Sequence, residues 1–543
     1  MNELSTLFSN VNDNETVVLE QNKIYDVRQD DSFLLTGYYC SNTAKKDENP
    51  NGTRYTAIYL KEKKNITLDG NGACVLVHGK MTPILLDHCE NITIKNLIID
   101  YSCPTMSEFK VLRSENGVCD IKINDDCLCR VDGNELFWIG ESDKNGKTYW
   151  EDSYHGNKRH IKVFDPETYE TRDFRRADLN FTKIEELEDN VLRVYFKNPE
   201  ICFKAGTTIQ TRNIIRDQVG SFFERCKNLK FINLRVKFMH GLGMVSQFCE
   251  NVSFINCDLT PADHRTVAST ADFFQFSGCK GQLEVIGCKA FGAHDDYINV
   301  HGTHLRIVKK SKKGNSLVVR FMHPESWGFQ AFEIGDELEF IKWDTLKPFG
   351  NVKVKHFTRL NDTDIKLFVE GDLPKLKKGK DVVENTSWTP DLLVQNCSFG
   401  QTAGRGILCT TRGRVVIENN KFFKLWGPAL LIEDDCNFWF ESGYTKEIIF
   451  RNNVIDACDF GPTFEGSPTI RYTPKVMKKK SKEFVHGRLI LENNTFKNSY
   501  GDTHLIHLEY LENAIIRNNV FDKEFKVETI CTGEVINENN IIK

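Results

Sequence analysis

The chain has 543 residues, and its 71 Lys and Arg against 76 Asp and Glu give a net charge of −5 at pH 7. This near-balance argues against a nucleic-acid partner bound through a basic surface, and a hydrophobic fraction of 40% argues against wholesale disorder. No apolar run approaches the ~18 residues of a transmembrane helix, so no membrane partner is expected. The N-terminal stretch has neither a basic start nor an apolar segment, which predicts a cytoplasmic protein without a secretion signal.

The 18 cysteines do not follow the spacing of a zinc site. No CxxC pair occurs, and the closest pair, Cys127 and Cys129, is one residue too tight. We therefore expect reduced, buried cysteines that fill a core.

Short segments of similar pattern recur along the chain. Each contains a polar turn, a short alternating apolar strand, an Asn and a second apolar strand. Examples are HCENITIKNLIIDY, RCKNLKFINLRVKF, FCENVSFINCDLTP, GCKGQLEVIGCKAF, RVVIENNKFF, EIIFRNNVID, RLILENNTFK and AIIRNNVFDK. Asn233 and Asn256 stand at the same place of successive repeats, and so do Asn494, Asn519 and Asn540.

The asparagines recur with a period of roughly 20–25 residues, and such a period without helical periodicity is typical of a β-solenoid. Asn at each corner tolerates the left-handed backbone of a bend, and stacked Asn side chains can form hydrogen bonds along the stack. Four cysteines occupy one equivalent position of the repeat and are expected in the core: Cys89, Cys226, Cys249 and Cys279. The sequence therefore predicts an all-β fold, a right-handed parallel β-helix, because an ordinary β-sandwich does not produce this period.

Two stretches, 104–216 and 306–390, interrupt the repeats. Both contain alternating strands, such as ELFWIGE in the first and ELEFIKW in the second, which predict inserted antiparallel β-barrel-like domains. The expected order is the N-terminal part of the β-helix (1–103), the first inserted domain (104–216), the central rungs (217–305), the second inserted domain (306–390) and the C-terminal rungs (391–543).

Two acidic groups lie one repeat apart. Asp272 ends the segment STAD, and Asp295 and Asp296 follow in GAHDDYINVHGTH, at the corresponding place of the next repeat. Stacked rungs are about 4.8 Å apart, so the three carboxylates are expected to be neighbours. Their repulsion predicts that at least one keeps a proton, and carboxyl groups in unlike protonation states are what glycoside hydrolysis requires. A calcium site or a solvated turn is the alternative.

Other polar residues are candidates for substrate binding. His294 and His301 flank the aspartates and fit either sugar hydroxyls or turn caps, and Asn299 fits either a sugar or another corner. Arg405 is a candidate partner for substrate or acid. The segment LLIEDDCNFWFESGY places acids beside an aromatic ring, which suits a sugar, although a loop packed on an insertion explains it equally well; its candidates are Glu433, Asp435, Trp439 and Glu441.

Several of these stretches resemble glycoside hydrolase family 110, the inverting α-1,3-galactosidases. The matching segments are DHCENITIKNLIIDY, TADFFQFSGCKG, HDDYINVHGTH, GRGILCTTRGRVVIENNKF and LLIEDDCNFWFESG. The resemblance covers nearly the whole chain and implies a β-helix with two inserted barrel-like domains. It also implies Asp295 and Asp296 as the acidic pair, Asp272 as a third carboxylate, and no metal or organic cofactor. The FFQF run after Asp272 departs from the more polar run expected there.

The predicted function is an exo-acting glycoside hydrolase that releases terminal α-1,3-linked galactose, as carried by the blood-group B antigen. A single displacement predicts acid and base carboxyl groups about 6.5–9.5 Å apart. The alternatives are another carbohydrate-active β-helix, namely a uronic-acid hydrolase or a polysaccharide lyase, and a non-enzymatic glycan-binding solenoid. A carbohydrate is the expected partner, and the flank of a β-helix also suits a homodimer.

Overall fold

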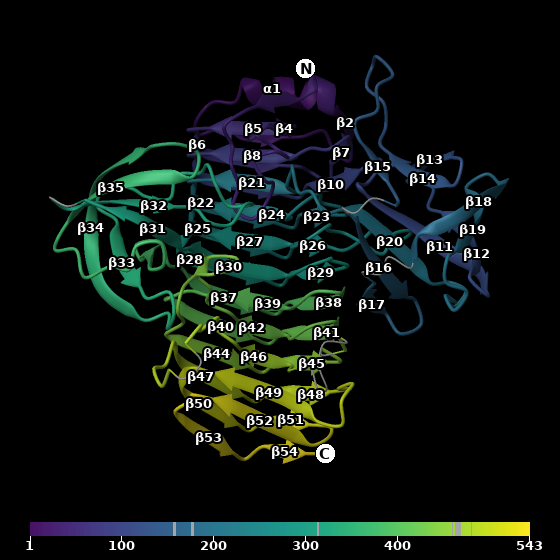
Figure 1. The fold of residues 1–543 in the computed structure, drawn as a ribbon. Helices are drawn as coiled ribbons and strands as arrows, with labels where there is room; N and C mark the ends of the chain where they lie inside the picture. The colour runs from purple at the N-terminus through teal and green to yellow at the C-terminus, as the bar shows by residue number, and fades with distance from the viewer. Residues whose placement is uncertain (156–158, 175–178, 312–313, 459, 462–467, 479–480) are drawn as a thin grey trace.

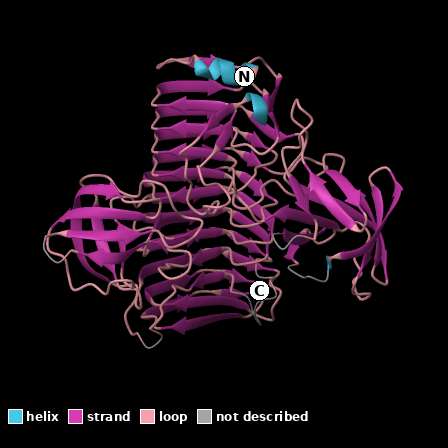
Figure 2. Cartoon of the chain, turned by 45° about the horizontal axis from the view of Figure 1, so that its top comes forward, coloured by secondary structure: helices cyan, strands magenta, loops and turns pink. Residues whose placement is uncertain are grey.

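The computed structural model describes residues 1–543 except 156–158, 175–178, 312–313, 459, 462–467 and 479–480. The chain winds into a column of stacked strands whose N- and C-termini lie at opposite ends, and two inserted domains project from its flanks (Figure 1). Strand dominates throughout (Figure 2). The column is a parallel β-helix, as the period of the repeats predicted. Among the described residues no helix has the length and apolarity needed to cross a membrane.

Three parallel sheets run along the column. The first contains, in order, β1 (Thr16–Val18), β6 (Lys64–Asp69), β9 (Glu90–Lys95), β22 (Lys227–Ile232), β25 (Glu250–Ile255), β28 (Lys280–Ile286), β37 (Asp391–Gln395), β40 (Arg414–Glu418), β44 (Glu447–Arg451), β47 (His486–Glu492), β50 (Leu511–Arg517) and β53 (Glu534–Glu538). The second contains β2 (Ile24–Arg28), β7 (Cys74–His78), β10 (Ile98–Tyr101), β23 (Arg235–Val236), β26 (Asp258–Leu259), β29 (Lys289–Phe291), β38 (Ser398–Thr402), β41 (Lys421–Leu425), β45 (Val454–Asp456), β48 (Thr495–Lys497), β51 (Val520–Phe521) and β54 (Ile541–Ile542).

The third sheet, called the site sheet below, carries the candidate active site on its outer face. Its order is β5 (Ile58–Lys61), β8 (Ile84–Asp87), β21 (Ser221–Glu224), β24 (Met244–Gln247), β27 (Phe274–Ser277), β30 (Ile298–Thr303), β39 (Ile407–Cys409), β42 (Leu430–Ile432), β46 (Ile470–Tyr472), β49 (His504–Glu509) and β52 (Phe525–Ile530). A short strand, β43 (Glu441–Ser442), pairs with β30 in the antiparallel sense.

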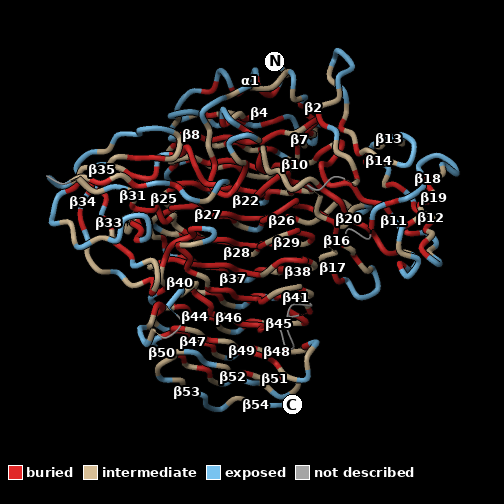
Figure 3. Tube along the Cα trace, in the orientation of Figure 1, coloured by how far each residue is buried: buried red, intermediate tan, exposed pale blue. Residues whose placement is uncertain are grey.

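One apolar core fills the column, because alternate side chains of every strand point inward. Figure 3 shows buried segments along most of the column, and the C-terminal strands β52 to β54 are more exposed. The N-terminal end of the core is covered by the helix α1 (Glu3–Ser9), which buries Leu4 and Phe8 and begins where the Asn2 side chain accepts the N–H of Ser5. So short a helix shows no helical period, and the sequence analysis did not predict it.

Asparagines form the bends in the left-handed conformation predicted for them. Asn233 and Asn256 both have a φ of 53°. In the C-terminal rungs the prediction is wrong by one residue. There the left-handed residue is the first Asn of each pair, with φ between 53° and 56°: Asn493, Asn518 and Asn539.

The second Asn of each pair points into the core and builds the predicted ladder. The N–H of Asn494 donates to Oδ1 of Asn519 at 2.9 Å, and the N–H of Asn519 donates to Oδ1 of Asn540 at 2.8 Å. Asn420 and Asn453 continue the ladder in the preceding rungs. The cysteines of the earlier rungs are free thiols that fill the core, and four stack at one position, as predicted: Cys89, Cys226, Cys249 and Cys279.

The first insertion leaves the column after β10 and returns before β21. Its seven-stranded sheet follows the order β17 (Glu170–Asp173), β16 (Arg159–Asp165), β20 (Thr208–Asn213), β11 (Met106–Glu115), β12 (Val118–Ile123), β19 (Val191–Phe196) and β18 (Phe181–Glu188). A second sheet contains β13 (Leu128–Asp132), β14 (Glu135–Ile139) and β15 (Glu151–Ser153), and the two share a core around Phe109 and Trp138.

The second insertion lies between β30 and β37 and forms a closed antiparallel barrel. Its order is β31 (Leu305–Lys310), β32 (Ser316–Arg320), β35 (Asp364–Glu370), β34 (Pro348–Arg359), β33 (Glu337–Ile341) and β36 (Val382–Asn385). Near the N-terminus, a 3-10 helix η1 (Gln29–Asp31) precedes an antiparallel hairpin of β3 (Phe33–Leu35) and β4 (Arg54–Thr56). The long connection of this hairpin lies against the site sheet.

Candidate active site

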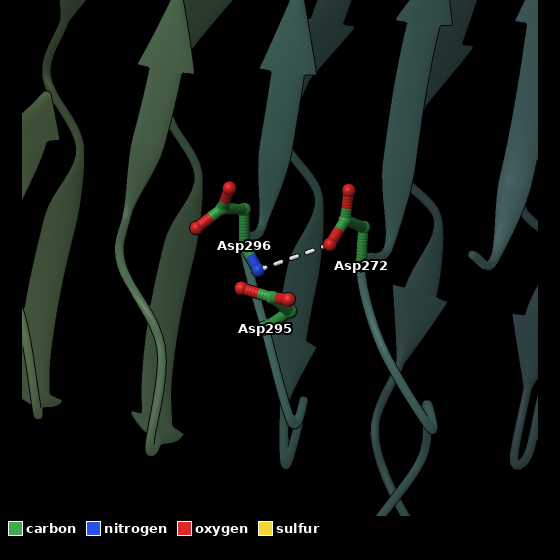
Figure 4. A group of neighbouring side chains, drawn as sticks. All are labelled: Asp272, Asp295 and Asp296. Carbon is green, nitrogen blue, oxygen red and sulfur yellow. Dashed lines mark hydrogen bonds between the residues drawn. The ribbon is translucent and has the colours of Figure 1, made fainter. Parts of the chain in front are cut away.

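Two neighbouring rungs bring the three predicted aspartates together. Asp272 immediately precedes the residues that lead into β27, and Asp296 stands at the equivalent place before β30, because Phe274 pairs with Ile298. The Asp296 N–H donates to Oδ1 of Asp272 at 3.2 Å (Figure 4).

The three carboxyl groups are closer than expected for a single displacement. One oxygen from each of Asp272, Asp295 and Asp296 lies within 4.8 Å of the others. The nearest oxygens of this trio are therefore closer together than the separation of acid and base that a single displacement predicts. The reason is that all three belong to directly stacked rungs.

A single arginine neutralises part of this charge. Nε of Arg405 lies 2.5 Å from Oδ1 of Asp296, and its Nη2 lies 2.9 Å from Oδ2 of the same carboxylate. The same Nη2 lies 3.0 Å from Oδ1 of Asp295. Arg405 thus holds Asp296 with a bidentate pair and reaches Asp295 with the same nitrogen.

Burial and mutual repulsion separate the pKa values of the trio. Burial, reinforced by the two neighbouring carboxylates, raises the pKa of Asp272 well above its usual value. Burial also raises the pKa of Asp296 to about 7, against the opposing effect of Arg405. Burial acts to raise the pKa of Asp295 too, but Arg405 and Lys162 outweigh it and hold the value low. The cluster therefore retains protons at neutral pH.

Only one of the three side chains is accessible from outside. The side chain of Asp295 is 37% exposed, that of Asp296 is 1% exposed, and residue Asp272 is 3% exposed. Asp295 thus stands in front, with the other two carboxyl groups recessed behind it.

A pocket of about 70 Å³, open to solvent, surrounds the aspartates. Segments from distant parts of the sequence line it: Asn42, Arg216, Leu242, Asp272, Gln275, Asp295, Asp296, Asn299, Arg405, Leu408, Glu433, Asp435, Trp439 and Glu441.

Asn299 and Glu441 face each other in this pocket. Nδ2 of Asn299 lies 3.4 Å from Oε1 of Glu441, and the buried Oδ1 of Asn299 has no hydrogen-bond partner among the described residues. Asn299 is a strand residue of β30 and not a corner. An unpartnered amide oxygen aimed at a polar pocket is suited to a ligand hydroxyl.

The segment after β42 forms one wall of the pocket. Trp439 is 44% exposed and stacks on His323 of the second insertion, with ring centroids 4.3 Å apart, so it both faces the pocket and packs on the barrel. Asp435 lines the same wall, but its carboxylate accepts the backbone N–H groups of Asn437 and Phe438 at 2.7 and 3.0 Å. It therefore shapes the loop that carries Trp439.

The two histidines predicted to bind substrate do not line the pocket. His294 is buried against the first insertion, where its Nε2 lies 2.9 Å from Oε1 of Gln210, and burial depresses its pKa strongly. His301 donates from Nδ1 to the Gly302 carbonyl at 2.8 Å and places Nε2 3.2 Å from Nε2 of Gln275. Both residues are 3% exposed and lie behind the residues that line the pocket, so their predicted contact with substrate stays a prediction.

Sequence analysis missed several pocket residues. Gln275 lies in the FFQF run that departed from the expected pattern, and it pairs in register with Asn299. Gln275 stands three residues after Asp272, as Asn299 does after Asp296. This shared spacing could have identified Gln275 as a pocket residue. Asn42 and Arg216 lie outside the repeats, where no periodicity marks them.

Three carboxylates at this spacing also match the oxygen ligands of a divalent cation. Arg405, however, already places its guanidinium against Asp295 and Asp296. A positive charge in that position opposes the binding of a second one, so the donor set fits proton transfer better than cation binding.

The chain resembles known enzymes over most of its length. Residues 316–383 match the family model described as GLAA-B beta-barrel domain II. The chain is 34% identical to the alpha-1,3-galactosidase A of Bacteroides fragilis over 490 residues, which are 89% of this chain and 78% of that protein. The chain is 35% identical to the alpha-1,3-galactosidase A of Akkermansia muciniphila over 498 residues, which are 91% of this chain and 79% of that protein. It is 30% identical to the alpha-1,3-galactosidase B of Bacteroides thetaiotaomicron over 529 residues, which are 93% of this chain and 82% of that protein. With this extent of identity, the chain belongs to the α-1,3-galactosidases, the glycoside hydrolase family 110 that its motifs resemble.

Proposed function

We propose that this glycoside hydrolase releases terminal α-1,3-linked galactose with inversion, with Asp295 as the general acid and Asp296 as the general base. The observation that carries the proposal is the cluster of one accessible and two recessed carboxyl groups beside Arg405.

Asp295 is the carboxyl group placed to meet the glycosidic oxygen. It alone exposes a large part of its side chain to the pocket. Substrate binding removes water from that part, which raises the pKa of a carboxyl group. Asp295 then takes up a proton from solvent and passes it to the leaving oxygen as the glycosidic bond breaks.

Asp296 suits the role of the base. Its pKa of about 7 makes it a stronger base than an ordinary carboxylate, and the bidentate contact with Arg405 fixes its orientation. It takes a proton from the attacking water, whose oxygen forms the new bond to the anomeric carbon. Asp272, with its raised pKa, stays protonated and limits the charge of the cluster.

The recessed positions of Asp296 and Asp272 support inversion despite the short spacing. In a retaining enzyme a second carboxylate attacks the sugar directly, so two carboxyl groups must touch it. Here Asp296 and Asp272 are nearly inaccessible, so neither is placed to attack the sugar directly.

Exo-action is supported by the walls of the pocket. Residues from outside the β-helix rungs, including Asn42 and Arg216, close its sides, where an open groove would accept a long chain. Six carboxylates against two arginines line it, so the pocket favours a neutral sugar such as galactose over a uronic acid.

The experiment is galactose release from an α-1,3-galactosyl disaccharide and from its fucosylated, blood-group B-type trisaccharide. We expect release by wild type and a loss of at least about a thousandfold in kcat for Asp295→Asn and for Asp296→Asn. The ratio of the two sugars identifies the preferred aglycone. No release from either sugar, together with an unsaturated uronide formed from a uronic-acid polymer, would replace this proposal with a lyase.

A further inference from the structure

The connection of the β3–β4 hairpin is a closed loop, residues 38–51, called the Ω-loop below. Two backbone hydrogen bonds hold its neck: the Gly37 N–H donates to the Asn51 carbonyl at 2.8 Å, and the Tyr38 N–H donates to the Gly52 carbonyl at 3.0 Å. A compact loop whose ends lie close together is typical of an Ω-loop, and the strands β3 and β4 could pair without it.

The Ω-loop places its inner residues directly on the site sheet. Residues 40–43 are at most 4% exposed, although most of them are polar. The Ser41 N–H donates to Oε1 of Gln247 at 2.9 Å, and Oγ of Ser277 lies 3.1 Å from Oγ of Ser41. Gln247 and Ser277 are paired at the ends of the neighbouring strands β24 and β27. Residues 40–43 therefore cover the outer face of the site sheet at this pair.

One residue of the Ω-loop completes the catalytic pocket. Nδ2 of Asn42 donates to Oε1 of Glu441 at 2.6 Å, and Oδ1 of Asn42 accepts from Oγ of Ser326 at 2.6 Å. The φ of Asn42 is 57°, a left-handed conformation that Asn and Gly tolerate best.

A second pocket lies on the other side of residues 40–43. Asp87, Glu224 and Gln247 are register neighbours in β8, β21 and β24, so they form one row along the site sheet. This second pocket, open to solvent, has a volume of about 420 Å³ and is lined by Tyr38, Tyr39, Asp87, Glu224, Phe329 and Arg359, among others. The Ω-loop therefore separates two hollows of one face.

We propose that the Ω-loop is the specificity element that restricts this enzyme to chain-terminal galactose. Residues 40–43 fill the space on the site sheet between the catalytic pocket and the second pocket. A galactose that carries a further sugar toward the second pocket therefore meets these residues. A glycan does not displace them readily, because Oε1 of Gln247 and Oε1 of Glu441 would each lose a buried hydrogen bond. The inference rests on the proposed hydrolysis of terminal α-galactosides.

The test compares two oligosaccharides, one ending in α-1,3-galactose and one in which the same galactose carries a further sugar. Wild type is compared with a variant in which an Asn-Gly turn replaces residues 38–51 and closes the hairpin. A second variant, Ser41→Gly with Asn42→Gly, keeps the backbone and removes only side chains. Lys46→Ala is the matched control, because Lys46 lies on the same loop with a 65% exposed side chain and pairs with Asp362 on the surface.

We expect wild type and Lys46→Ala to cleave the internal bond with a kcat/KM far below that for the terminal bond. Excision of the Ω-loop raises the ratio of kcat/KM for the internal bond to that for the terminal bond at least tenfold, and the double glycine variant raises it at least threefold. An excised variant that is folded and cleaves the terminal bond at an unchanged ratio would overturn the proposal. If excision prevents folding, the double glycine variant decides: an unchanged ratio of internal to terminal kcat/KM in that variant would also overturn the proposal.

Failure of the proposed function would look different. Wild type would then release no galactose from the terminal substrate. Calorimetric binding of the same two oligosaccharides would still decide the role of the Ω-loop: it is supported if only the variants bind the extended sugar, and overturned if wild type binds both equally.

Discussion

Replacement of Arg405 by Met should move the pH dependence of catalysis upward. In the wild type the base Asp296, with a pKa of about 7, must lose its proton before it can act, so kcat/KM should fall below that pH. The guanidinium of Arg405 stabilises the ionised form of Asp296 through contacts of 2.5 and 2.9 Å. Without that cation the carboxyl group keeps its proton to a higher pH.

The size of the shift follows from the geometry. Unit charges about 4 Å apart interact by about 4 kcal/mol at an effective dielectric constant near 20, which corresponds to roughly three pKa units. Lys162 and Arg216 remain nearby, and water enters the space left by Arg405, so about one to two units is the expected rise. The loss of kcat/KM in Arg405→Met, relative to wild type, should then be about 10- to 100-fold larger at pH 6 than at pH 9.

The assay is kcat/KM for the α-1,3-galactosyl disaccharide between pH 4 and pH 9.5, for wild type, Arg405→Met and Arg405→Lys. Arg405→Lys is the matched control: it keeps the charge without the bidentate geometry, so it should lower the rate but keep the acid limb near its wild-type position. Circular dichroism at each pH confirms folding. An acid limb that stays in place in Arg405→Met, with an equal loss at every pH, would refute the reasoning.

Three further predictions concern the structure around the site. Gly404→Ala should lower kcat/KM at least tenfold, because its Cβ would overlap the carbonyl oxygen of Asp295 and push that residue out of place; unchanged kinetics would contradict this. Asn453→Ala should lower the free energy of unfolding by about 2–4 kcal/mol, since the buried N–H of Asn420 loses its acceptor, and a denaturation midpoint equal to that of wild type would count against the ladder. Asp272 has a usual pKa of 3.8 that is raised on folding, so the folded state holds a proton that the unfolded chain releases, and stability falls by up to about 1.4 kcal/mol per pH unit above pH 4. Asp272→Asn should flatten the decrease in melting temperature between pH 5 and pH 8, whereas an equal decrease would show that this carboxyl group is ionised in the folded state.

The repeat pattern predicted the β-helix because each rung imposes the same local demands. A corner needs a left-handed residue, and the following strand needs inward apolar side chains, so both are written into every repeat. The pairs Asn493–Asn494 and Asn518–Asn519 show the limit of this reasoning. Adjacent identical residues take different roles, one at the corner and one in the core, and spacing alone does not tell them apart.

The candidate site was predictable only where it belongs to the repeats. Asp272 and Asp296 occupy equivalent places of stacked rungs, so their separation in sequence predicted that they meet. His294 is adjacent in sequence to the aspartates, yet it turns toward the first insertion, because side-chain direction depends on a contact that no period encodes. Asn42 reaches the pocket from a loop that lies 399 residues from Glu441, and only the assembled fold brings them together.

The anomeric configuration of the first released sugar tests the central claim most directly. Wild-type enzyme and the α-1,3-galactosyl disaccharide are mixed in an NMR tube, and the anomeric proton of free galactose is followed before mutarotation. Attack by a water held by Asp296, with Asp295 donating the proton, predicts β-galactose as the first product. Initial release of α-galactose would show a covalent intermediate on one of the clustered carboxylates and would contradict the account of a single displacement.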